Sequence, residues 1–260
     1  MIRRPPRSTP KPSSAASDVY KRQLIVCASA QKSKTEKVLF VGNSFTFYFN
    51  LPLVVESMAD EKGVGLDVYQ STAGGASLKD HWIGKRNLST KSKIQNGNFD
   101  KIILQDYSTN PVNKTAESLD YFNRFIDLAK SVDAKVYIYG TWPVPTMQGK
   151  AYDGIDPIQH ALKPLSADNV TLIPVGTAFR LFQAEYPEIS LYTSDNKHPS
   201  PVGTYLAACF FLKVLTGKSP KGLYRRFDRK DENGKKIFLG MVETTDAKKC
   251  QQIVELMNIK

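Results

Sequence analysis

An alternation of short apolar runs with longer helical patterns constrains the fold of this chain more than any other feature. The runs are rich in Val, Ile and Leu, as are strands of a parallel sheet that is covered on both faces. The five predicted strands are Lys37–Val41, Leu66–Gln70, Lys101–Gln105, Lys135–Tyr139 and Val170–Val175. The predicted helices are Leu51–Lys62, Ala116–Ser131, Pro157–Leu165, Ala178–Glu185 and Pro201–Leu215. This order predicts a doubly wound α/β sandwich of three layers around a mainly parallel five-stranded sheet.

The last part of the chain gives a weaker pattern. We expect an extra strand at Lys236–Met241 and a terminal helix at Asp246–Met257, with Thr244 or Thr245 near its start. Beyond residue 30 no segment holds eighteen uncharged apolar residues, so we expect no membrane span.

The first 23 residues do not resemble a segment that evolved to fold. Residues 1–9 can be written in codons that resemble a flow-cell adapter of DNA sequencing libraries. Residues 13–23 can be written in codons that resemble the transposase adapter that follows it. We therefore interpret residues 1–23 as translated adapter, against the alternative of a natural basic disordered tail, and exclude them from fold reasoning.

Residues 24–30 (LIVCASA) join an apolar stub to the small-residue pattern of a cleavage site. We interpret them as the end of a signal peptide, with a lipoprotein anchored through Cys27 as the alternative. The prediction is a secreted or periplasmic bacterial protein whose single domain spans residues 31–260.

The formal net charge of +11 overstates how basic this domain is. Residues 1–23 hold six basic side chains and one acidic one, a net +5, which leaves +6 for the rest. We therefore expect no nucleic-acid partner, and we interpret the basic run at residues 218–236 as a solvated loop. Cys209 and Cys250 lack metal-ligand spacing, and we expect two buried thiols, with a disulfide as the alternative.

The candidate chemistry lies after the predicted strands, where ligands bind in open parallel sheets. Ser44 follows the first strand in Gly42-Asn43-Ser44, where a sharp turn can expose its hydroxyl next to helix amides. A helix cap is the alternative role for this serine. Gly74 and Gly75 end the second strand, where bare backbone N–H groups can approach a substrate, or where they form a simple tight turn.

After the third strand, Gln105 can donate its amide to an oxyanion or a substrate carbonyl, or it can cap the next turn. Ser108 and Asn110 are its rivals for the first role.

Asp195 and His198 are close enough in sequence to share one loop before the last large helix. An aspartate that accepts from imidazole Nδ1–H would orient Nε2 towards a hydroxyl. The chain has three histidines. We interpret His160 as a surface or packing residue, and His81 either as part of the mouth of the site or as structural.

The order of these blocks resembles the SGNH (GDSL-like) hydrolase family. The run HPSPVGTYLAACFF, residues 198–211, is especially similar to the last block of that family. The resemblance extends from about Lys37 to Gly217, and it implies a flavodoxin-like sandwich and a serine hydrolase.

Carried over by position, the resemblance implies that Ser44 is the nucleophile and that His198 and Asp195 complete a triad. It also implies an oxyanion hole that contains the backbone N–H of Ser44 and of Gly74 or Gly75.

Two blocks depart from the family pattern. Asn43 stands where an aspartate commonly precedes the serine, and the third block lacks Gly-x-Asn-Asp, so Gln105 is our substitute for the missing oxyanion donor. We expect Asn43, His81, Ser108 and Trp142 to contact the substrate.

The resemblance is to branches from bacteria that degrade glycans, and it implies a cofactor-free, metal-free esterase that removes a small acyl group, such as acetyl, from an oligosaccharide or a smaller ester. The alternatives are a lipid or aryl esterase of the same fold and a carbohydrate-binding protein that has lost catalysis. The sequence leaves the oligomeric state open.

Overall fold

The computed structural model describes residues 34–144 and 156–257. Its central sheet has five parallel strands in the order β2-β1-β3-β4-β5. The strands are β1 (Glu36–Gly42), β2 (Leu66–Thr72), β3 (Lys101–Leu104), β4 (Lys135–Gly140) and β5 (Val170–Pro174). All five predicted strands and the predicted fold class are confirmed.

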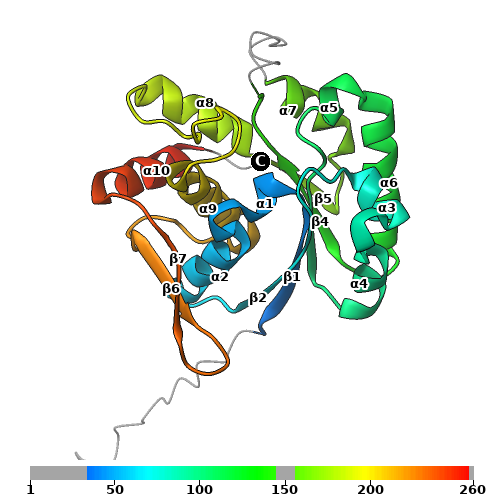
Figure 1. Cartoon of the computed structure of the whole chain (residues 1–260), viewed down its shortest axis with the longest axis horizontal. Coiled ribbons are helices and arrows are strands. Elements are labelled where there is room, and N and C mark those ends of the chain that lie inside the picture. Colours follow the sequence, from blue (N-terminus) through cyan, green and yellow to red (C-terminus); the bar gives the residue numbers. More distant parts are fainter. Residues whose placement is uncertain (1–33, 145–155, 258–260) are drawn as a thin grey trace, which may run out of the picture. The chain divides into compact units, whose positions relative to one another are not determined.

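Two layers of helices cover the sheet (Figure 1). One layer contains α2 (Leu51–Glu61), α8 (Val175–Glu185), α9 (Pro201–Thr216) and α10 (Thr244–Leu256). The other contains α3 (Leu78–Ile83), α4 (Thr90–Gly97), α5 (Asn110–Asn113), α6 (Thr115–Lys130) and α7 (Pro157–Leu162). The three-layer arrangement explains why the strands are apolar on both faces.

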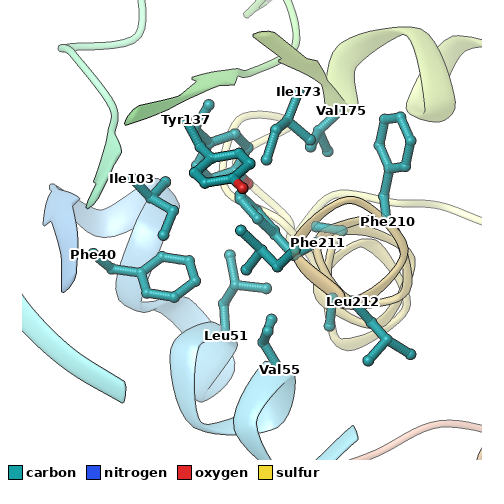
Figure 2. Close-up of a cluster of buried hydrophobic side chains, with 14 of the residues drawn as sticks. Phe40, Leu51, Val55, Ile103, Tyr137, Ile173, Val175, Phe210, Phe211 and Leu212 are labelled. Carbon is teal, nitrogen blue, oxygen red and sulfur yellow. The ribbon is translucent and has the colours of Figure 1, made fainter. Parts of the chain in front are cut away.

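The core between the sheet and helices α2 and α9 is dense with aromatic rings (Figure 2). Phe40 of β1 and Phe211 of α9 are fully buried and meet edge to face, with ring centroids 5.4 Å apart. Helix α9 is capped by Ser200, has Pro201 in its first turn, and ends at Gly217 with φ at +69°. These caps fix where α9 begins, and the loop that precedes it carries His198.

Helix α1 and three short turns complete the described helical elements. Helix α1 (Ser44–Phe47) begins just after β1 and runs into the turn η1 (Tyr48–Asn50). The turn η2 (Lys85–Asn87) follows α3, and Arg86 and Asn87 in it have positive φ, so it is not a regular 3-10 helix. A third, η4 (Lys163–Leu165), continues α7, because Pro164 has no N–H to extend the α-helical ladder that the sequence predicted through Leu165.

A two-stranded antiparallel hairpin lies before α10. Its strands are β6 (Arg226–Lys230) and β7 (Lys236–Met241). The predicted strand and terminal helix are confirmed, whereas β6 was not predicted because four of its five residues are charged.

Several other predictions can be compared with the described residues. Cys209 and Cys250 are free, buried thiols, as expected. No described helix is long and apolar enough to cross a membrane. The predicted adapter and signal-peptide segments, residues 1–23 and 24–30, lie outside the described residues.

Candidate active site

Ser44 is the first residue of α1, just beyond the carboxyl end of β1, which lies between β2 and β3 in the sheet. The side chain of Asn43 accepts a hydrogen bond from Phe45 N–H at 3.1 Å and caps the helix. Gly42 is required for this turn, because an added Cβ would lie 2.3 Å from Thr46 Oγ1. The result is a half-buried Ser44 just beyond the carboxyl end of β1.

His198 and Asp195 meet Ser44 in one chain of hydrogen bonds. Ser44 Oγ lies 2.8 Å from His198 Nε2, and His198 Nδ1 lies 2.5 Å from Asp195 Oδ2. With Asp195 ionised, Nδ1–H donates to the carboxylate and Nε2 is left to accept from the Ser44 hydroxyl. This arrangement can remove a proton from Ser44.

The loop that carries Asp195 and His198 is closed upon itself. Asp195 Oδ1 accepts from the backbone N–H groups of Lys197 and His198, both at 2.9 Å, and from Thr193 Oγ1 at 2.8 Å. Although desolvation acts in the opposite direction, these hydrogen bonds and the one from the His198 ring hold the pKa of Asp195 well below its usual value. The carboxylate is therefore ionised at any pH at which the protein would work.

Backbone contacts fasten the two ends of this loop together. Thr193 N–H donates to His198 O at 2.9 Å, and Ser200 N–H donates to Leu191 O at 2.8 Å. Asp195 and His198 thus lie in one loop whose two ends are joined by backbone hydrogen bonds.

Aromatic rings surround the imidazole of His198. The Tyr48 ring is stacked on it at 4.3 Å with an interplanar angle of 11°, and the Phe45 ring meets it at its edge at 5.4 Å. Trp142 is stacked between Phe45 at 5.0 Å and Phe179 at 4.1 Å.

Trp142 is only 1% exposed, and its Nε1–H donates to Lys197 O at 2.9 Å. The expectation that Trp142 contacts substrate is therefore contradicted, because its ring is enclosed and its single donor is used. It braces the loop of His198 instead. The sequence carried no signal for Tyr48, since its role depends on a 3-10 turn that was not predicted.

The two glycines form an exposed turn next to Ser44. Ala76 N–H donates to Ala73 O at 3.1 Å and closes the turn, with Gly74 and Gly75 as its central residues. Within the described part of the chain, the N–H groups of Ser44, Gly74 and Gly75 donate to no acceptor. They are available as donors to an oxyanion.

Gln105 does not have the predicted role of oxyanion donor. Its side chain is fully buried, and its Oε1 accepts from Asn43 N–H and from Thr46 Oγ1, both at 2.9 Å. Its Nε2 donates to Asp106 O. Because every polar atom of the amide is used, Gln105 holds the turn before Ser44 and cannot reach a substrate.

Asn43 and His81 were expected to contact substrate, and both are buried instead. Asn43 is 2% exposed, and its Nδ2 donates to Ala76 O at 2.9 Å. His81 is fully buried, with Nδ1 2.7 Å from Thr90 Oγ1 and Nε2 3.0 Å from Gly42 O. Desolvation lowers the pKa of His81 to about 4. Both side chains support the backbone around Ser44.

Asn110 and Ser108 were the alternatives to Gln105 as oxyanion donor, and they differ in their hydrogen bonds. Asn110 Nδ2 lies 3.4 Å from Asp106 Oδ1. Burial raises the pKa of the Asp106 carboxyl. Ser108 is 3% exposed, and its Oγ has no hydrogen-bond partner in residues 34–144 and 156–257. Ser108, which was also expected to contact substrate, is as buried as Asn43 and His81, but its hydroxyl is uncommitted among the described residues, unlike the amide of Gln105. In the same ranges no three His, Cys, Asp or Glu side chains are grouped to hold a metal ion.

Comparison with known proteins identifies the fold. No protein-family model matches the chain, and no curated protein matches its sequence. Among solved structures, one from Slackia heliotrinireducens, assigned as an SGNH hydrolase, is 25% identical with a TM-score of 0.57, over 70% of this chain and 99% of its own. A DUF4886 family protein from Bacteroides uniformis ATCC 8492 is 18% identical with a TM-score of 0.64, over 85% and 93%.

An acetyl xylan esterase, AlAXEase, is 16% identical with a TM-score of 0.56, over 69% of this chain and 99% of its own. The chain shares its fold with solved SGNH hydrolases, esterases and lipases. Fold and site geometry together indicate a hydrolase.

Proposed function

We propose that this protein is a serine esterase that removes a small acyl group, in the first place acetyl, from a carbohydrate. The observation that carries the proposal is the hydrogen-bonded chain from Ser44 Oγ through His198 to Asp195. A hydroxyl, an imidazole and an ionised carboxylate at these distances form the arrangement that activates a serine for acyl transfer.

The proposed reaction has two halves. His198 Nε2 takes the proton of Ser44 Oγ as the oxygen bonds to the ester carbonyl carbon, and His198 then gives that proton to the leaving alcohol. A water molecule attacks the acyl-enzyme in the same way, with His198 as base, and releases the acid and free Ser44. Asp195 stabilises the imidazolium that forms in each half.

The carbonyl oxygen becomes an oxyanion in both halves. The N–H of Ser44 and one from the Gly74–Gly75 turn are the proposed donors, because both are uncommitted within the described residues. Ser108 is the proposed third donor in place of Gln105.

The carbohydrate acetyl ester is proposed by analogy of fold, with the structural likeness to an acetyl xylan esterase in support. Secretion is likewise a proposal, from residues 24–30 alone.

Replacement of Ser44 tests the proposal. We expect Ser44→Ala to lower kcat on p-nitrophenyl acetate by up to about a millionfold, with the melting temperature unchanged. Ser57→Ala is the matched control, since Ser57 Oγ donates only to Leu53 O within α2. A Ser44→Ala rate above about a tenth of the parent rate would exclude Ser44 as nucleophile.

The same assay, run on acetylated xylan fragments and on other acetylated oligosaccharides, separates the classes of protein. A parent protein that binds these sugars and hydrolyses none of their esters would be a carbohydrate-binding protein.

An apolar pocket favours one second candidate, an aryl or longer-chain esterase. The pocket has a volume of about 140 Å³, and Phe49, Thr204, Phe227, Phe238 and Met241 are among its lining residues. Phe49 directly follows Tyr48, whose ring is stacked on His198. A series of p-nitrophenyl esters decides between the candidates: kcat/KM that rises from acetate to hexanoate would favour the second.

A further inference from the structure

The orientation of the peptide unit between Gly74 and Gly75 determines whether the glycine turn directs an N–H group or a carbonyl group towards Ser44. Gly75 lies in the left-handed region at φ +67°, whereas Gly74 does not, which is the pattern of a type II β-turn. Turns of types I and II differ by a flip of the central peptide unit, and two successive glycines permit either form. In one form the Gly75 N–H points to a given side of the turn, and in the other form the Gly74 carbonyl points to that same side.

Contacts at both ends of this turn place it beside Ser44. Ala73 N–H donates to Gly42 O at 3.3 Å, and Asn43 Nδ2 donates to Ala76 O at 2.9 Å. The two residues that precede Ser44 therefore hold the residues on either side of the glycine pair. A donor would stabilise the oxyanion only if the central peptide is in the correct orientation.

Arg86 contacts this central peptide. Its Nη1 donates to Gly74 O, and its Nη2 lies 4.0 Å from the position of a Cβ on Gly75. In a trans peptide the C=O and the following N–H point in opposite directions. A guanidinium that holds the Gly74 carbonyl therefore fixes the Gly75 N–H on the far side of the turn from Arg86.

The backbone of Arg86 is unusual for an arginine. Leu88 N–H donates to Lys85 O at 3.2 Å, and the residues between, Arg86 and Asn87, both have φ at +59°. This is a type I′ turn, whose central positions favour Gly, Asn and Asp. An arginine in this position strains the backbone, and such strain is typical of residues retained for function.

No other contact explains the arginine. Its side chain is exposed, and it makes no ion pair within residues 34–144 and 156–257. Its neighbour Lys85 pairs with Asp80 at 3.3 Å and does not touch the glycine turn.

We propose that Arg86 is a positioning residue, which holds the Gly74–Gly75 peptide so that Gly75 N–H is turned towards the oxyanion at Ser44. The charge of the guanidinium also polarises this peptide and makes its N–H a stronger donor. The inference rests on the proposed esterase function, and it selects Gly75 over Gly74 as the donor.

Arg86→Gly separates positioning from structural support. Glycine relieves the strained φ, so we expect a melting temperature that is unchanged or higher. We expect kcat on p-nitrophenyl acetate to fall by about tenfold or more, short of the 10²–10³ of a deleted donor, with KM changed less than about twofold. Arg86→Lys should retain part of kcat, because an ammonium can hold the carbonyl without the fork of the guanidinium.

Two further measurements make the test specific. Guanidinium chloride at about 20 mM should restore part of kcat to Arg86→Gly, whereas sodium chloride at the same ionic strength should not. Lys85→Ala, in the same turn, should match the parent. A boronic acid that forms an anionic adduct with serine should bind Arg86→Gly more weakly by the factor that kcat loses.

The inference is overturned if Arg86→Gly keeps kcat within about twofold of the parent, or if its kcat and melting temperature fall together without rescue. Ser44→Ala is measured beside it. An inactive Ser44→Ala with a fully active Arg86→Gly would reject the role of Arg86 alone. An active Ser44→Ala would reject the esterase mechanism and this inference with it.

Discussion

Two histidine side chains contact the Gly42–Ser44 turn, and only one of them has the hydrogen-bond partners of a general base. His198 is partly exposed and lies between a carboxylate and a hydroxyl. His81 is fully buried, and its ring nitrogens meet the Thr90 hydroxyl and the Gly42 carbonyl. The partners of an imidazole therefore decide which histidine we propose as the base: His198 has an ionised acceptor on one nitrogen and a hydroxyl on the other.

The largest effect is expected at His198. His198→Ala removes the base and should lower kcat/KM on an acetyl ester by up to about a millionfold, with little change in the melting temperature. His81→Gln, which can still donate to Gly42 O and accept from Thr90, should keep most of the activity per folded molecule. Equal losses of kcat/KM in the two variants would contradict the assignment of different roles to His198 and His81.

Asp195 should matter less than His198. Asp195→Ala leaves the base in place but removes its orientation and charge partner, and we expect a loss of roughly 10⁴-fold in kcat/KM. The His198→Ala, Asp195→Ala double variant should lose little more than His198→Ala alone. Losses in free energy that simply add would show that Asp195 acts independently, and the triad would have to be abandoned.

The sequence predicted the sheet well because the strands inside it are buried on both faces. In β3 (Lys101–Leu104) the last three residues are all apolar, so the signal of this strand does not depend on its neighbours. Helix α4 was missed because only Thr90 and Ile94 of its residues are buried, and β6 because Phe227 alone is buried. Short elements with one or two buried positions lack the periodicity on which such predictions rest.

Position along the chain predicted which side chains come together, whereas side-chain direction could not be predicted. Ser44, His198 and Asp195 are brought together as their order implied. The error at Gln105 arose because an amide after a strand can point to a substrate or to the backbone, and only its partners decide. Arg86 was not predicted as a site residue. Its side chain reaches the Gly74 carbonyl from a turn whose residues have left-handed backbone angles, and the sequence did not indicate that turn.

His81 should make stability depend on pH. Burial lowers its pKa to about 4, below the ordinary value of 6.5. The folded state thus prefers neutral His81, and this contribution is complete above pH 6.5 and is lost as the pH falls from 6.5 to 4, up to about 3 kcal/mol. Urea unfolding of the parent and of His81→Gln at pH 7, 6, 5 and 4 measures it. Identical pH dependence in both would contradict the burial argument.

The smallest effect is expected at Tyr48, whose ring is stacked on His198. An aromatic face stabilises the imidazolium that forms during the reaction, so Tyr48→Leu should lower kcat/KM roughly three- to tenfold. Tyr224→Leu is the control, since Tyr224 is 69% exposed and no ring contact to His198 involves it. An unchanged rate for Tyr48→Leu would mean that the ring only fills space.

The closed loop from Leu191 to Ser200 has a consequence for how this protein can change over evolution. Its two ends are joined by backbone hydrogen bonds, and the geometry between Asp195 and His198 is set inside the loop. Insertions or deletions before Leu191 or after Gly217 therefore alter the surroundings of the pair but not the pair itself. Asp195 and His198 therefore form one structural unit, and residues around it can change without altering the geometry of the pair.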